Sequence, residues 1–133
     1  MKEDLQLNVL LVDDNDIDVV VNTKLLRLAN LTEHISAFSD GESAIQYMVD
    51  NMNDLKAHLN VLLLDIQMPG ADGFKVLTDY QNLPDDFKSS CKVFMLSSSI
   101  DRNDIERAEN IPDIIKVLEK PLDVYLLRRL IQD

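Results

Sequence analysis

Five short apolar runs alternate with segments of helical pattern, and this alternation constrains the fold more than any other feature of the chain. Apolar runs bounded by polar turns are typical of strands buried on both faces, as in a parallel sheet covered by helices. The order predicts an α/β fold of the (βα)5 type: a doubly wound, five-stranded parallel sheet with helices on both faces. The predicted strands are residues 9–12, 35–38, 61–64, 93–96 and 114–118.

Apolar residues at helical spacing fill the segments between these strands. Those that mark one face of the first helix, the face an amphipathic helix turns to the core, are Ile17, Val20, Val21, Leu25 and Leu28. The second helix is marked by Ala44, Ile45, Met48 and Val49, and the third, beginning at Gly73, by Phe74, Leu77 and Tyr80. Asp101 is predicted to cap a fourth helix through about Asn110, and Asp123 a fifth that carries Leu126, Leu127, Leu130 and Ile131. The polar stretch NLPDDFKSS, residues 82–90, is predicted to be a loop.

Length and composition suit a single domain. The chain has 133 residues, of which 46% are hydrophobic and 28% charged, so residues 1–133 are predicted to form one domain, with no room for an output domain. The net charge of −11 argues against direct contact with nucleic acid. Neither a targeting peptide nor an apolar stretch long enough to span a membrane is visible, so a cytoplasmic location without a membrane partner is expected.

Polar residues follow four of the predicted strands. Asp13 and Asp14 follow the first, Asp65 the third, Ser97 the fourth and Lys120 comes just after the fifth. Right-handed crossovers place the carboxyl ends of parallel strands at one edge of the sheet, where open α/β folds bind ligands. Each residue alone has an ordinary explanation as a turn or capping residue. Their occurrence at successive strand ends favours a common site.

Carboxylates gathered at one edge repel each other unless a cation joins them. Oxygen ligands of this kind favour Mg²⁺ over zinc. The metal ion and Lys120 would neutralise an incoming phosphoryl group, to which the Ser97 hydroxyl could donate a hydrogen bond. Asp65 is then the predicted nucleophile, and its product is an aspartyl phosphate.

These residues resemble the receiver domain of two-component response regulators over nearly the whole chain, from about residue 8 to residue 131. The resemblance implies a flavodoxin-like strand order, 2-1-3-4-5. The blocks that carry the resemblance are LVDDN, LLLDIQMPGADGF, VFMLSSS and EKPL, in that order. The resemblance implies that Asp65 is the phosphoacceptor and that Asp13, Asp14, Asp65 and the backbone carbonyl of Gln67 bind Mg²⁺, with Asp14 and Asp65 favoured as direct ligands.

The same resemblance assigns the remaining site residues. It implies that Ser97 contacts the phosphoryl group, that Lys120 pairs with it and that the peptide before Pro121 is cis. One departure is Val117, three residues before the lysine, where the family usually carries Tyr or Phe. Because valine has no ring to turn inward, a large aromatic movement at this position cannot occur.

The implied function is that of a receiver in a two-component or phosphorelay system. A sensor histidine kinase or a histidine phosphotransfer protein would phosphorylate Asp65, and the chain would signal to a partner protein by conformational change. No enzymatic activity is expected beyond self-phosphorylation and autodephosphorylation. The implied partner surface combines the fourth helix, last strand and fifth helix, including Ile105, Glu109, Val117, Tyr125 and Arg128. The sequence leaves open which partner applies and whether the domain stands alone.

Two alternatives use related chemistry or a related sheet. A haloacid-dehalogenase-like phosphatase or phosphotransferase would need a second aspartate two residues after the nucleophile, where this chain has Gln67, so the proton donor for turnover is missing. A flavodoxin-like cofactor binder would need a phosphate-binding loop after the first strand, where Asp13 and Asp14 would repel a phosphate unless a metal ion were present.

Overall fold

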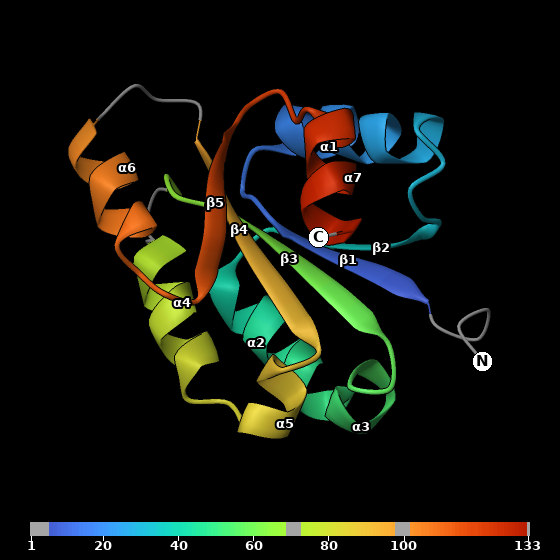
Figure 1. Cartoon of the computed structure of the whole chain (residues 1–133), viewed down its shortest axis with the longest axis vertical. Helices are drawn as coiled ribbons and strands as arrows, with labels where there is room; N and C mark the ends of the chain where they lie inside the picture. Colours follow the sequence, from blue (N-terminus) through green and yellow to red (C-terminus); the bar gives the residue numbers. More distant parts are fainter. Residues whose placement is uncertain (1–5, 69–72, 98–101, 133) are drawn as a thin grey trace.

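The computed structural model describes residues 6–68, 73–97 and 102–132, and its strands form one parallel sheet (Figure 1). The strand order is β2-β1-β3-β4-β5, with parallel pairing throughout, which confirms the predicted topology. Each of the five predicted strands lies within an observed one. The strands are β1 (Leu7–Val12), β2 (His34–Phe38), β3 (Leu59–Asp65), β4 (Cys91–Ser97) and β5 (Ile114–Glu119).

Helices cover both faces of the sheet (Figure 1). One face carries α1 (Asp16–Leu28) and α7 (Val124–Gln132). The other face carries α2 (Gly41–Asp50), α3 (Met52–Leu55), α4 (Gly73–Gln81), α5 (Asp85–Lys88) and α6 (Arg102–Glu109). Within the three described stretches of chain, none of the helices has the length and apolar character needed to cross a membrane.

The strands are buried on both faces, as their apolar sequence predicts. In β1, Leu10 and Val12 pack with the layer of α2 and α4, whereas Val9 and Leu11 pack with the layer of α1 and α7. This alternation follows from the two-residue period of a strand and divides the core into two apolar layers.

The helix boundaries agree with the sequence in part. Asp123 caps α7, since its Oδ1 accepts hydrogen bonds from the backbone N–H groups of Tyr125 and Leu126. Asp101 lies outside the described residues. The stretch 82–90 was predicted to be a loop, but it contains α5, a single helical turn that places Phe87 in the core with no exposed surface. One buried aromatic therefore organises a segment whose composition is otherwise polar.

The predicted buried face of α1 is wrong. Ile17, Val20, Val21 and Leu28 are 74%, 54%, 40% and 80% exposed, and only Leu25 of that set packs against the core. The buried residues of α1 are Asn22 and Leu26. Polar contacts account for the orientation of α1. Asp18 forms an ion pair with Lys120, and Asn22 accepts a hydrogen bond from the Leu122 N–H at 3.2 Å. These contacts turn the stripe that contains Asp18, Asn22 and Leu26 inward, which a hydrophobic pattern cannot reveal. On α2, Val49 is likewise 48% exposed.

Candidate functional site

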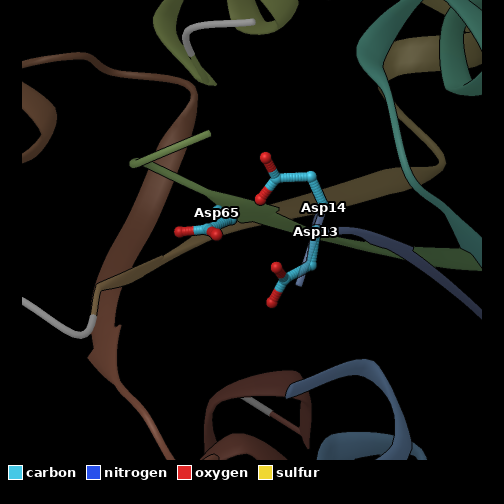
Figure 2. A group of neighbouring side chains, drawn as sticks. All are labelled: Asp13, Asp14 and Asp65. Atoms are coloured by element: carbon cyan, nitrogen blue, oxygen red, sulfur yellow. The ribbon is translucent and has the colours of Figure 1, made fainter. Parts of the chain in front are cut away.

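Three carboxylates meet at the carboxyl edge of the sheet (Figure 2). Asp13 and Asp14 directly follow β1, and Asp65 is the last residue of the adjacent β3. One carboxylate oxygen from each lies within 4.8 Å of the others. Asp13 and Asp65 are almost completely buried, whereas Asp14 is more exposed. The structure thus brings together the acidic residues that the sequence singled out.

Backbone hydrogen bonds beyond the strands hold the residues of this edge in place. The Asp13 N–H donates to the Phe38 carbonyl at 3.0 Å, and the Lys120 N–H donates to the Ser97 carbonyl at 3.0 Å. Side-chain oxygens are also held: the Asn15 N–H donates to Asp13 Oδ1 at 2.9 Å, and the Gln67 N–H to Asp65 Oδ1 at 3.1 Å. Each buried carboxylate therefore has one oxygen fixed by the backbone and the other directed into the site.

Lys120 places its ammonium group among these carboxylates. Its Nζ lies 2.9 Å from Asp13 Oδ2 and 3.0 Å from Asp65 Oδ2, and its side chain is only 7% exposed. A third ion pair, at 2.9 Å, joins Nζ to Asp18 Oδ2 in the first turn of α1. Asp18 is the residue that sequence reasoning missed. Acidic residues are common in the first turn of a helix, so the position of Asp18 in the sequence does not indicate that its side chain reaches the end of β5.

Burial and charge act in opposite directions on the groups of the site. Burial raises the pKa of Asp65 to about 6, although the hydrogen bond and charge of Lys120 and the Gln67 N–H oppose that rise. Burial lowers the pKa of Lys120, but its contacts with three carboxylates more than compensate, so the net shift is upward. Lys120 therefore remains an ammonium, and burial disfavours the ionised form of Asp65.

Ser97 and Gln67 both lie close in the chain to the carboxyl edge of the sheet, at or just after the ends of β4 and β3. Ser97, the last residue of β4, is 2% exposed, and its strand pairs with β3 so that Leu96 lies opposite Asp65. Gln67 is half-buried two residues after Asp65. The peptide between Lys120 and Pro121 is cis, as the family resemblance implied.

The predicted partner surface is mixed in its exposure. Tyr125 and Glu109 are exposed, Ile105 is half-buried, and Val117 is half-buried against the apolar layer under α4. Arg128 instead donates a hydrogen bond to the Ala29 carbonyl at the end of α1. Its guanidinium is therefore engaged with α1.

The acidic group fits a divalent cation. Asp13 Oδ2 is buried and accepts no well-aligned hydrogen bond, although it forms an ion pair with Lys120. An oxygen with spare lone pairs, beside two further carboxylates, is a suitable ligand for a hard cation such as Mg²⁺. The donor set contains only oxygen, which does not suit zinc.

Comparisons with known proteins identify one family. The family model of the response regulator receiver domain matches residues 9–132. The chain is similar to the solved structure of a response regulator receiver protein from Dyadobacter fermentans DSM 18053, with 34% identity, 95% of each chain covered and a TM-score of 0.82. A two-component response regulator structure from Cytophaga hutchinsonii is 30% identical over 96% of each chain, with a TM-score of 0.81.

A curated plant relative is similar over part of its length. The two-component response regulator ARR7 of Arabidopsis thaliana is 28% identical over 130 residues, which cover 92% of this chain and 56% of the relative. None of these findings supports the haloacid-dehalogenase alternative. The sheet order, the acidic edge and the family match agree, and the chain belongs to the response regulator receiver domain family.

Proposed function

We propose that this chain accepts a phosphoryl group on Asp65 from a histidine kinase or a histidine phosphotransfer protein and passes the signal to a partner by conformational change. The observation that carries the proposal is the position of Lys120, whose Nζ lies within 3.0 Å of both Asp13 and Asp65. A buried ammonium beside a buried carboxylate at the carboxyl edge is suited to receive an anionic phosphoryl group.

The chemistry is a single displacement at phosphorus. An oxygen of Asp65 attacks the phosphorus atom and forms an O–P bond, while the bond from phosphorus to the donor breaks. The electron pair of that bond stays on the leaving imidazole nitrogen, or on the carboxylate oxygen of an acyl phosphate donor. Asp65 Oδ1 is held by the Gln67 N–H, so Oδ2, which faces Lys120, is the oxygen directed to the donor.

The other residues assist charge and position. Lys120 offsets the negative charge of the transferred group, and the Ser97 hydroxyl donates a hydrogen bond to one of its oxygens. Asp13, Asp14, Asp65 and the Gln67 carbonyl would hold Mg²⁺. When bound, the ion would supply positive charge beside the phosphoryl oxygens. The chain is not proposed to turn over an external substrate.

The direct test is a mass measurement with site mapping. The wild-type chain, treated with acetyl phosphate and Mg²⁺, should gain the mass of one phosphoryl group. Borohydride reduction converts an aspartyl phosphate to homoserine, and peptide mapping should place that change at residue 65. Uptake at another residue, or no uptake from either acetyl phosphate or a phosphohistidine protein, would contradict the proposal.

The exposed side of α1 is proposed as the docking surface for the phosphoryl donor. We define the α1 outer face as Ile17, Val20, Val21 and Leu28, all at least 40% exposed. The helix starts three residues after Asp13, and Asp18 within it contacts Lys120. A donor must bring its phosphohistidine to Asp65, so an apolar surface on the adjacent helix is well placed to hold the donor. The downstream target is proposed to bind the surface of α6, β5 and α7 that the family resemblance implies.

Donor docking on the α1 outer face predicts a selective defect. Replacing Ile17 and Val20 with serine should slow transfer from a phosphorylated histidine phosphotransfer protein by about 100-fold or more, because each aliphatic side chain buried in an interface contributes roughly 1.5–3 kcal/mol. The rate with acetyl phosphate should not change. Val49→Ser is the matched control, since Val49 is similarly exposed on α2, on the other side of the sheet. Equal slowing with both donors would argue against docking here.

A further inference from the structure

Asp18 lies beside the site without belonging to the acidic group that fits a metal ion. That group consists of Asp13, Asp14 and Asp65. The Asp18 Oδ2 atom lies 2.9 Å from Lys120 Nζ, and 34% of the side chain is exposed. Its carboxylate therefore contacts the lysine and is not one of the oxygens gathered at the metal position.

The backbone of Asp18 is fixed by the start of α1. Asn15 caps the helix, and its Oδ1 accepts a hydrogen bond from the Asp18 N–H at 3.0 Å. One turn later on the same side of α1, Asn22 Oδ1 accepts a hydrogen bond from the Leu122 N–H. Two polar side chains of α1 thus hold residues 120 and 122, on either side of Pro121. The helix acts as the support for the segment that carries Lys120.

Lys120 forms ion pairs with Asp13, Asp18 and Asp65, and it donates hydrogen bonds to Asp18 and Asp65. Two of these partners, Asp13 and Asp65, are also proposed to bind Mg²⁺, and Asp65 is proposed to carry the phosphoryl group. Their oxygens would then be shared with other positive centres. The Asp18 carboxylate, in contrast, would contact Lys120 without also binding Mg²⁺ or carrying the phosphoryl group.

We propose that Asp18 is a positioning residue that keeps the Lys120 ammonium beside Asp65 during phosphoryl transfer. The inference rests on the proposed function of Asp65. Lysine is a flexible side chain with four methylene groups, and an anchor outside the reacting group reduces the number of orientations that it can adopt. An ammonium group that is already in position lowers the barrier to phosphoryl transfer, because it needs no further reorientation to contact the phosphoryl oxygens.

A purely structural role for Asp18 must be separated from this one. An acidic residue in the first turn stabilises a helix through the helix dipole, whatever its side chain touches. Asp16 lies in the same first turn and is exposed, which makes Asp16→Ala the matched control. A helix-dipole effect would appear in both variants, whereas an effect through Lys120 would appear only in Asp18→Ala.

The first measurement is the rate of phosphorylation by acetyl phosphate in saturating Mg²⁺, followed by intact mass. Asp18→Ala should slow the rate by about tenfold. Asp18→Asn keeps an oxygen that can accept from Lys120 and should recover most of the rate, and Asp16→Ala should equal wild type. In a Lys120→Met background, Asp18→Ala should make no further difference, because its effect passes through the lysine.

The second measurement needs no phosphorylation. Buried, hydrogen-bonded lysine ammonium protons exchange slowly enough for nitrogen-correlated NMR, and the Lys120 Nζ signal should be visible in wild type and in Asp16→Ala. It should broaden or disappear in Asp18→Ala and return in Asp18→Asn. This readout reports the position of the ammonium group even if a variant has a slightly lower stability.

The outcomes separate the two proposals. A wild-type chain that takes up no phosphoryl group would overturn the proposed function and this inference with it. A phosphorylated wild type with an equal rate for Asp18→Ala, or a double mutant slower than Lys120→Met, would overturn only the role of Asp18. An unchanged Lys120 ammonium signal in Asp18→Ala would do the same.

Discussion

Replacing Asp65 with asparagine is expected to abolish phosphoryl uptake and, at the same time, to stabilise the metal-free protein. The first effect follows because an amide is not a nucleophile towards phosphorus under these conditions. The second follows from burial, which raises the pKa of Asp65 from 3.8 to about 6. When the pKa of a carboxyl group is higher in the folded state than in the unfolded state, ionisation of that group destabilises the folded state. This loss of stability develops between about pH 4 and pH 6 and remains at higher pH.

The size of this stabilisation can be estimated from the shift. About two pH units correspond to roughly 3 kcal/mol. In urea denaturation with EDTA, Asp65→Asn should exceed wild type by up to about 3 kcal/mol at pH 8, and the difference should vanish near pH 4. Asp40→Asn is the control, because hydrogen bonds from Ser43 lower the pKa of the exposed Asp40. If the difference in unfolding free energy between Asp65→Asn and wild type does not depend on pH, the raised pKa assigned to Asp65 is contradicted.

Gly73→Ala is expected to impair both stability and phosphorylation. A Cβ atom at residue 73 would lie 2.2 Å from the Asp65 carbonyl oxygen and 3.1 Å from the Ile66 Cα. Both are backbone atoms and cannot rotate away, so either α4 or the end of β3 must shift. Alanine in a helix gains at most about 1 kcal/mol over glycine, whereas overpacking costs about 1–3 kcal/mol or more. Because a displacement of about 1 Å at a reacting group can cost about 100-fold in rate, phosphorylation should fall by that order.

Gly41→Ala provides the comparison for this variant. Its Cβ would also approach to 2.2 Å, but the neighbouring atom is Cγ2 of the Val76 side chain. That contact is with a side chain and not with the backbone of β3, so Gly41→Ala should lose stability and keep its rate of phosphorylation. Thermal unfolding and the acetyl phosphate assay distinguish the two variants. A normal phosphorylation rate in Gly73→Ala would show that the Asp65 backbone tolerates the displacement.

The strands and the acidic edge could be predicted because their signals are local. A run such as residues 61–64 is apolar on both faces, and the residue that ends it must emerge at the sheet edge. Parallel order then brings Asp13, Asp65 and Lys120 together without further information. The grouping of these side chains could therefore be predicted from the strand ends alone.

The orientation of α1 and the role of Asp18 depend on contacts between distant segments. More of the apolar residues of α1 lie on its exposed side than pack against the core, so a hydrophobic pattern selects the exposed side. The exposed ones are Ile17, Val20, Val21 and Leu28, and the packed ones are Val19, Leu25 and Leu26. What turns the helix is the pair of polar contacts from Asp18 and Asn22 to residues about 100 positions later. The short helix α5 was missed for a related reason, since only the burial of Phe87 distinguishes it from a polar loop.

The guanidinium of Arg107 on α6 lies over the ring of Phe74, with Cζ 3.9 Å from the ring centroid. Phe74 follows Gly73, which packs directly against the Asp65 backbone. A continuous set of contacts therefore leads from Asp65, the proposed phosphoacceptor, to α6 through the first turn of α4, and chains of packed side chains of this kind carry energetic coupling. This path does not pass through residue 117, so valine at that position leaves a set of contacts through which α6 could respond to a phosphoryl group on Asp65.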